Sequence, residues 1–259
     1  MTDFSKMKLG KSAPVYNSKT PRFANYADDL PLAPDSLDLS GKLQNLGVML
    51  NDSLGDCTCA AVGHVIQTWT SLTRPQQVIL PDSAILELYE KSCGYVPGNP
   101  ATDQGGDENS VLQYWRDSGI FPGNTLAGWC TVQPGNHEQV KQALMLFGAV
   151  YIGVDLPISC QSQSVWDVPA GGPVGPGAPG SWGGHAVPIV AYDATTLTFI
   201  TWGQLMKMTW DFWDAYVDEA HGLLGADWID LSANAAGNYW SPTGQYWTKI
   251  KADCMALGQ

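Results

Sequence analysis

The sequence predicts an α+β fold in which a mainly helical first half is followed by a strand-rich second half. Apolar residues recur three and four positions apart after Cys57, which indicates a buried helix. From Val150 onward, short apolar runs are bounded by turn residues, which indicates strands. The chain has 259 residues, of which 44% are hydrophobic, so it can form one large domain or two subdomains that share a cleft.

We divide the chain into three parts on this pattern. Residues 1–34 have little apolar periodicity and are expected to form an extended arm over the domain, because they contain four prolines: Pro14, Pro21, Pro31 and Pro34. This arm looks too short and irregular for a propeptide. Residues 35–148 are expected to form a helical subdomain and residues 149–259 a β-rich subdomain, which together make one domain.

Four helices are expected in the first half. The longest begins at Cys57 and ends where Arg74 precedes a proline. A second runs from Asp82 to Gly94, and two shorter ones cover about 109–116 and 138–147.

Three strands are expected in the second half, at 150–154, 186–192 and 196–202, the last two joined by a tight turn around Asp193. The stretch from Pro169 to Gly184 is too rich in glycine and proline for regular structure and is expected to be a loop. Residues 209–216 form a tryptophan-rich amphipathic pattern, for which core packing is favoured over a stacking platform for a sugar or a base.

Composition excludes several kinds of partner. Only 15% of residues are charged and the formal net charge is −12, which disfavours nucleic acids and anionic membranes. The N-terminus is polar and no run of 18 apolar residues occurs, so neither a signal peptide nor a membrane span is expected. The six cysteines are therefore expected to be reduced thiols in the cytoplasm, unless a signal peptide has been removed.

The stretch from Asn51 to His64, N-D-S-L-G-D-C-T-C-A-A-V-G-H, carries the main chemical signal. A cysteine in the first turn of a helix lies against free backbone N–H groups and the positive end of the helix dipole, which favours the thiolate. Cys57 is therefore a candidate nucleophile. Asp56 either repels this thiolate or caps the helix with its carboxylate, and capping is the better interpretation.

The motif L-G-D-C resembles the calpain version of the papain-like cysteine peptidase motif, written Q-x-x-L-G-D-C-W. Asn51 stands six residues before Cys57, in the place of the glutamine, and Thr58 replaces the tryptophan. The preceding residues 37–51 also resemble the start of mature papain. The resemblance implies that Asn51 and the Cys57 N–H hold an oxyanion, with a side chain one methylene shorter than glutamine.

His185 is the expected proton-transfer partner of Cys57. The segment G-G-H-A-V, residues 183–187, resembles the G-H-A motif of the same family, followed by a strand. An imidazole can pair with a thiolate and later protonate a leaving amine. The resemblance implies a papain-like fold with the active site between a helical and a β subdomain. His64 lies two turns along the Cys57 helix, and His137 and His221 are assigned to ordinary helical contexts.

The residue that orients the histidine departs from the family pattern. The family supplies asparagine in N-S-W-G, whereas this chain has Ile200-Thr201-Trp202-Gly203. Trp202 matches the tryptophan that shields the pair from water, but isoleucine makes no side-chain hydrogen bond. Three alternatives stay open: a Cys–His dyad oriented by a backbone carbonyl or water, Thr201 reached through a strand irregularity, or Gln204 folding back.

No metal or cofactor is expected. Cys59 lies two residues after Cys57, but a zinc site needs four ligands and no second cluster exists, so Cys59 is assigned to the core. The remaining cysteines, Cys93, Cys130, Cys160 and Cys254, are assigned to packing. The acidic loop 103–107 lacks the alternating Asp and Asn ligands of a calcium loop.

The sequence thus favours a cysteine peptidase or related amide hydrolase that acts on peptides or proteins through an acyl-enzyme formed on Cys57. Two alternatives belong to other classes. One is a catalytically silent papain-like binding module, motivated by Thr58 and Ile200. The other is an acyl transferase, transglutaminase-like, that passes the acyl group to an amine.

Overall fold

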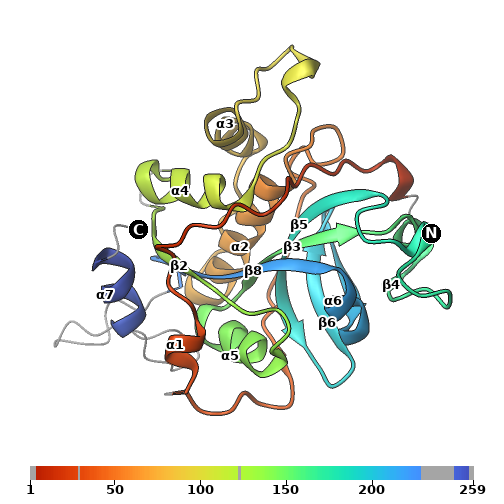
Figure 1. The fold of residues 1–259 in the computed structure, drawn as a ribbon. Helices are drawn as coiled ribbons and strands as arrows, with labels where there is room; N and C mark the ends of the chain where they lie inside the picture. Colours follow the sequence, from red (N-terminus) through yellow and green to blue (C-terminus); the bar gives the residue numbers. More distant parts are fainter. Residues whose placement is uncertain (1–3, 29, 122–123, 229–247, 257–259) are drawn as a thin grey trace.

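The computed structural model describes residues 4–28, 30–121, 124–228 and 248–256. In it, helices pack against a mainly antiparallel sheet (Figure 1). The fold is the α+β arrangement that the sequence predicted. The outer limits of the three predicted parts, residues 1–3 and 257–259, lie outside the described residues.

All four predicted helices of the first half are confirmed. They are α2 (Cys57–Thr73), α3 (Asp82–Cys93), α4 (Glu108–Ser118) and α5 (His137–Phe147). Gly94 ends α3 in the left-handed region, with φ of 77°, where a residue without a side chain is unstrained. The tryptophan-rich run forms α6 (Trp210–Tyr216), and its four large aromatic side chains are buried in the core, as expected. Two short helices, α1 (Ala24–Ala27) and α7 (Thr248–Ala256), lie toward the two ends of the chain. Short 3₁₀ helices are found at Phe4–Lys6, Pro100–Thr102, Ile158–Ser162 and Gly175–Gly177.

The three predicted strands are β3 (Val150–Leu156), β5 (Gly183–Tyr192) and β6 (Thr196–Thr201). The sheet also contains strands that the sequence pattern did not identify: β1 (Leu37–Asp38), β2 (Leu126–Thr131), β4 (Val165–Trp166), β7 (Gln204–Thr209) and β8 (Val217–Gly225). The described strands follow the order β2-β8-β3-β5-β6-β7-β4, with β1 on β5. All pairs are antiparallel except β4 with β7.

The sheet draws strands from both halves of the chain. Strand β2 lies inside the part expected to be helical, yet it pairs with β8. Its residues, L-A-G-W-C-T, are buried or half-buried without alternation. The sequence therefore lacks the alternation of apolar and polar residues that indicates a strand, and the strand is recognised by its backbone pairing with β8. His221 was expected in a helical context, and this prediction is wrong because His221 lies in β8.

Helix α2 is the central element. Every residue from Cys57 to Ser71 is buried, and the helix packs against β5 on the sheet. Trp69 donates its indole N–H to the carbonyl of Phe147 at 2.7 Å, which ties the helix to the end of α5. A helix buried on all sides is held in place by the layers around it, so Cys57 at its start has a fixed position.

The N-terminal arm runs between the helices and the sheet before it reaches α1 (Figure 1). It contains the 3₁₀ turn Phe4–Lys6 and helix α1, and it forms isolated bridges from Lys11 to Gly106 and from Arg22 to Thr131. The arm therefore touches both structural layers.

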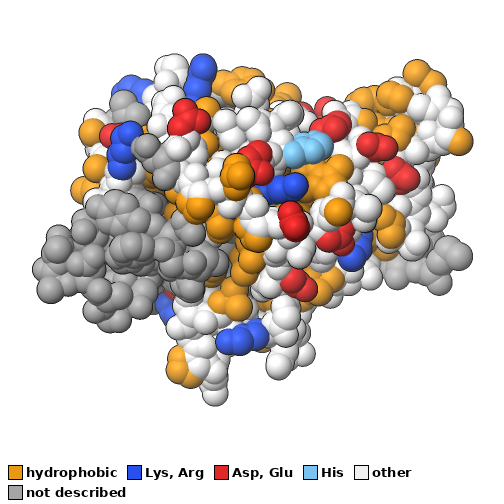
Figure 2. Space-filling view, turned by 90° about the horizontal axis from the view of Figure 1, so that it is seen from below, with side chains coloured by type: hydrophobic (Ala, Val, Ile, Leu, Met, Phe, Trp, Pro, Cys, Tyr) orange, Lys and Arg blue, Asp and Glu red, His pale blue; other side chains and the backbone are white. Residues whose placement is uncertain are grey.

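Figure 2 shows the molecule from below: acidic and hydrophobic side chains are scattered over this face together with a few basic ones. Among the described helices, none combines the length and the apolar character that crossing a membrane requires.

Candidate active site

Cys57 is the first residue of α2. The chain enters this helix through Gly55, whose N–H donates to Asp103 Oδ1 at 2.9 Å; the same oxygen accepts from the Tyr89 hydroxyl at 2.7 Å. Asp103 thus fixes the loop before the nucleophile. The Cys57 N–H belongs to the first turn, where backbone donors lack an acceptor within the helix.

Asp56 does not cap α2, so the capping prediction is wrong. Its φ and ψ are −100° and 20°, away from the extended conformation of a capping residue, and its side chain accepts no capping hydrogen bond. The carboxyl is fully buried. Burial raises the pKa of Asp56 to about 8, although the nearby Asn51 amide partly offsets this effect. At neutral pH the group is mostly protonated and does not repel a thiolate.

His185 lies in β5, and Thr201 at the end of β6 contacts it. The distance from His185 Nε2 to Thr201 Oγ1 is 2.7 Å. Thr201 is followed by the two-residue turn Trp202-Gly203, with φ of 46° and 74°, the conformation that closes tight hairpins. Of the three alternatives for orienting His185, the structure thus has Thr201 in contact. Gln204 pairs with Thr201 across the hairpin.

Trp202 covers the histidine. Its ring stacks on the His185 ring with centroids 4.7 Å apart and an interplanar angle of 22°. Phe4 stacks on the same indole at 5.3 Å. Trp202 therefore lies over the His185 ring, where its indole can shield the imidazole from water.

One small cavity of about 10 Å³ joins the candidate residues, and it is lined by Val48, Asn51, Cys57, Ala60, Ala61, His64, His185, Ala186, Ile200, Thr201 and Trp202. This is about the smallest volume that holds one water molecule. His185 Nδ1 is buried without a hydrogen-bond partner in the described residues, so it remains available to the thiol. The Asn51 amide donates one N–H to the Leu54 carbonyl at 3.1 Å and retains a second N–H.

His64 reaches the same cavity, although the sequence placed it two turns from Cys57. Its Nδ1 is 2.8 Å from Gln67 Oε1, so it is a hydrogen-bonded helix histidine, as expected. Burial lowers the pKa of His64 to about 4, which leaves the ring neutral at pH 7.

The Cys57 and His185 side chains are closed off from solvent, each 1% exposed. Burial raises the pKa of Cys57 to about 12 and lowers that of His185 to about 3. Backbone groups of Ala186 and Gly10 approach the thiol and lower its pKa in part. These shifts favour a neutral thiol and a neutral imidazole over an ion pair.

The N-terminal arm causes this closure. Lys11 N–H donates to the Gly184 carbonyl at 3.1 Å, and the Gly106 N–H donates to the Gly10 carbonyl at 2.8 Å. A Cβ atom on Gly10 would lie 1.8 Å from the Gly55 carbonyl oxygen. The backbone of the arm therefore fits closely between the loop before Cys57 and the strand that carries His185.

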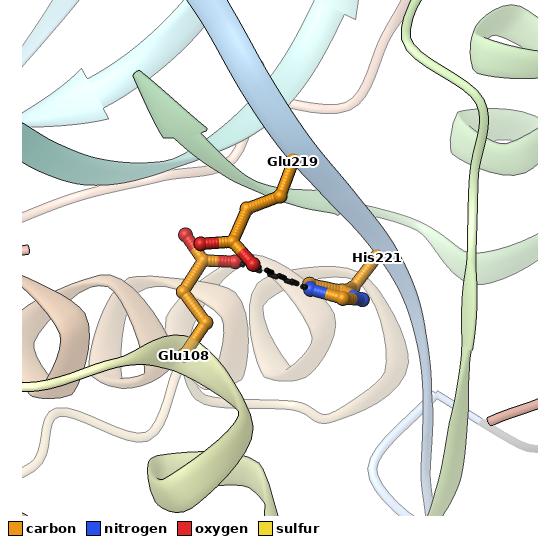
Figure 3. Close-up of side chains that lie close together, drawn as sticks. All are labelled: Glu108, Glu219 and His221. Atoms are coloured by element: carbon orange, nitrogen blue, oxygen red, sulfur yellow. Dashed lines mark hydrogen bonds and ion pairs between the residues drawn. The ribbon is translucent and has the colours of Figure 1, made fainter. Parts of the chain in front are cut away.

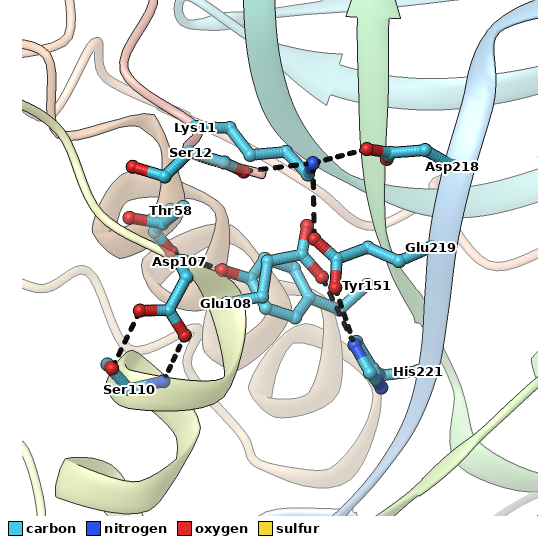
Figure 4. Close-up of polar contacts among 10 residues, drawn as sticks. All are labelled: Lys11, Ser12, Thr58, Asp107, Glu108, Ser110, Tyr151, Asp218, Glu219 and His221. Carbon is cyan, nitrogen blue, oxygen red and sulfur yellow. Dashed lines mark hydrogen bonds and ion pairs between the residues drawn. The ribbon is translucent and has the colours of Figure 1, made fainter. Parts of the chain in front are cut away.

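A second group of polar side chains lies beside this site and was not identified from the sequence. Glu108 from α4 and Glu219 and His221 from β8 point toward one another (Figure 3). With Asp218 they form what we call the acidic pocket, and the Lys11 ammonium lies in it (Figure 4). Among the described residues, Glu108, Glu219 and His221 are the group whose ligand atoms lie close enough to hold a metal ion.

Comparisons with known proteins bear on the fold. No protein-family model matches the chain, and no curated protein matches it. Among solved structures it is similar to xylellain, a cysteine protease from Xylella fastidiosa, with a TM-score of 0.64, 13% identity, and coverage of 85% of this chain and 96% of that one. A Carica candamarcensis cysteine protease gives a TM-score of 0.55 at 16% identity, with coverage of 74% of this chain and 98% of that one. Procathepsin B S9 from Trypanosoma congolense gives a TM-score of 0.58 at 13% identity, with coverage of 87% of this chain and 88% of that one. The chain therefore has the papain-like fold that the motif resemblance implied.

Proposed function

We propose that this papain-like protein is a cysteine peptidase or a related thiol-dependent amide hydrolase. The observation that carries the proposal is the single cavity lined by Cys57, at the start of a buried helix, and by His185, whose Nε2 contacts Thr201. A nucleophile, a base and a group that orients the base are the parts that acyl transfer requires.

The tautomer of His185 follows from its contacts. If Nε2 carries the proton and donates to Thr201 Oγ1, Nδ1 keeps a lone pair for the Cys57 thiol proton. Sγ then attacks the substrate carbonyl carbon. The oxyanion that forms accepts hydrogen bonds from the Cys57 N–H and from the second N–H of Asn51.

The cycle closes in two further steps. The tetrahedral intermediate collapses, the C–N bond breaks, and the leaving amine takes the proton from His185 Nδ1. Water then loses a proton to His185 and attacks the thioester carbonyl. This second attack releases the carboxylic acid and returns the thiol on Cys57.

A catalytically silent binding module is the second candidate, and burial favours it. Both Cys57 and His185 are closed off, and their pKa values are shifted away from an ion pair by that burial. In the hydrolase, this neutral state belongs to the arm-covered form, and removing the arm from the site restores solvent and the ordinary pKa values.

The test compares full-length Gly10→Ala, whose arm cannot seat at Gly55, with the same variant carrying Cys57→Ala or His185→Ala. Each is incubated with a peptide library, and the products are identified by mass spectrometry. Cleavage that depends on both residues supports the hydrolase. Rapid alkylation of Cys57 without cleavage of any peptide contradicts it; product formation that needs an added amine would identify a transferase instead.

A further inference from the structure

The Lys11 side chain is a buried cation in a chain that has only 13 lysine and arginine residues. It is 1% exposed, and its Nζ lies 2.7 Å from Asp218 Oδ2 and 3.2 Å from Glu219 Oε1. Lys11 and Asp218 are 207 residues apart in the sequence. Burying an ammonium group is costly unless carboxylates compensate it, so the acidic pocket is what allows this side chain to leave water.

The pocket holds more carboxyl groups than the two that Lys11 contacts. Both oxygens of Glu108 are buried without a hydrogen-bond partner in the described residues, and Glu108 Oε2 lies 3.6 Å from His221 Nε2. His221 also contacts Glu219 Oε2 at 3.3 Å. Burial next to Glu219 raises the pKa of Glu108 well above its ordinary value. Such an arrangement gains by holding a cation and loses when the cation is removed.

The backbone of Lys11 is held beside the candidate nucleophile as an extended peptide would be held. The Lys11 N–H donates to Gly184, the residue before His185, at 3.1 Å. On either side, Gly106 accepts from the Ser12 N–H at 3.0 Å and donates to the Gly10 carbonyl at 2.8 Å. Backbone pairing of this kind binds any peptide, and side-chain pockets then select among peptides.

The shape of the pocket admits a long unbranched side chain. A Cβ atom on Gly153 of β3 would lie 1.9 Å from Lys11 Cε and 2.7 Å from Asp218 Oδ1. Any larger residue at this position would close the channel along which the lysine stem runs. Gly153 therefore leaves room for the lysine stem. The carboxylates of Asp218 and Glu219 at the far end receive the charge (Figure 4).

We propose that the acidic pocket of Glu108, Asp218, Glu219 and His221 recognises a lysine or arginine side chain of the peptide substrate, and that Lys11 occupies this pocket in the arm-covered form. This inference rests on the proposed function, because only an enzyme that acts on peptides has a peptide substrate. Binding of a basic side chain beside Cys57 is measurable without any turnover, so the two proposals can fail separately.

The test uses Lys11→Ala in the Gly10→Ala background, where the arm cannot seat at Gly55, and measures how far peptides slow the alkylation of Cys57 by iodoacetamide. Acetylated tetrapeptides carry a single lysine, arginine or norleucine at each position in turn. We expect a basic peptide to protect Cys57 at concentrations about tenfold lower than its norleucine counterpart, because norleucine keeps the stem but lacks the charge.

Two variants locate the effect. Adding Glu219→Gln to Lys11→Ala should remove the preference for lysine, whereas adding Asp117→Asn, at an exposed acid on α4, should leave it intact. If Lys11→Ala unfolds, Lys11→Arg replaces it in the test. Because the arginine keeps a cation in the pocket, peptides should bind more weakly overall but basic peptides should still be favoured.

Equal protection by lysine and norleucine peptides would overturn the proposal while leaving the hydrolase intact if cleavage occurs. Protection by basic peptides with no cleavage of any peptide would support the pocket and contradict the hydrolase. Stabilisation of Lys11→Ala by Zn²⁺ or Mn²⁺, with no discrimination between peptides, would also overturn it in favour of a metal site.

Discussion

Gly10→Ala should open the candidate active site while leaving the fold intact. The new Cβ atom would lie 1.8 Å from the Gly55 carbonyl oxygen, so the two backbones must separate by about 1.6 Å to reach an ordinary contact of 3.4 Å. Gly55 is held by its hydrogen bond to Asp103 at 2.9 Å and leads directly into α2. The arm is therefore the side that moves.

The magnitude follows from the hydrogen bonds that this movement breaks. The Gly106 to Gly10 bond of 2.8 Å and the Lys11 to Gly184 bond of 3.1 Å both stretch out of range. At about 1 kcal/mol each, their loss shifts the closed-to-open equilibrium of the arm by about 2 kcal/mol, or roughly 30-fold. Alkylation of Cys57 proceeds through the open form, because burial raises the thiol pKa to about 12 in the closed form. We expect about 30-fold faster alkylation.

The assay is intact-mass labelling with limiting iodoacetamide at pH 7.5, followed by peptide mapping. Mapping is required because Cys93 is only partly buried and can react as well. Gly41→Ala is the matched control, since a Cβ atom there has no neighbour within 4 Å. An unchanged rate at Cys57 in folded Gly10→Ala, or an increase at Cys93 alone, would refute the view that the arm controls access.

Three other predictions concern single residues, with the activity measurements made in the Gly10→Ala background. Thr201→Val should lower kcat about tenfold to a hundredfold with little change in KM, because His185 loses the group that fixes its tautomer, whereas Thr201→Ser should retain activity; equal kcat values in steady-state peptide assays would contradict this role. Asn51→Ala should lower kcat by about a hundredfold through loss of an oxyanion donor, and a change confined to KM would rule out that role. Asp56→Asn should change how stability depends on pH: burial raises the folded pKa of Asp56 to about 8, so the wild type holds a proton there that the unfolded chain has already released, and its stability falls from about pH 4 to pH 8. Urea unfolding at pH 5 and pH 8.5 should show that the advantage of Asp56→Asn grows with pH, by several kcal/mol, and an advantage independent of pH would show that Asp56 ionises normally.

The helices of the first half, and the position of the candidate nucleophile at a helix start, could be predicted from local sequence alone. Apolar spacing marks α2, the Gly55-Asp56-Cys57 step marks its start, and glycine after α3 marks an end. These signals are local because helix hydrogen bonds and capping involve residues within one turn. The motif around His185 likewise identified a strand that follows the histidine.

From the sequence, the residue that orients His185 could be narrowed to a few alternatives, but the sequence could not decide among them. Thr201 and Gln204 face each other across a hairpin, and the two-residue turn between them decides which one meets the imidazole. The state of Asp56 was misjudged for a related reason. Its distance from solvent depends on the layers packed around α2, and burial alone decides whether its carboxyl is ionised.

The sequence by itself determined the α+β class and the helix that begins at Cys57, and it named Cys57 and His185 as the candidate pair, because each depends on a short pattern. Only the tertiary structure decided that β1 and β2 join the sheet of the second half and that the arm closes the site. It also decided that Lys11 enters the acidic pocket. No local pattern distinguishes Lys11 from an exposed lysine, since the carboxylates that compensate its charge come from Glu108, Asp218 and Glu219, far along the chain.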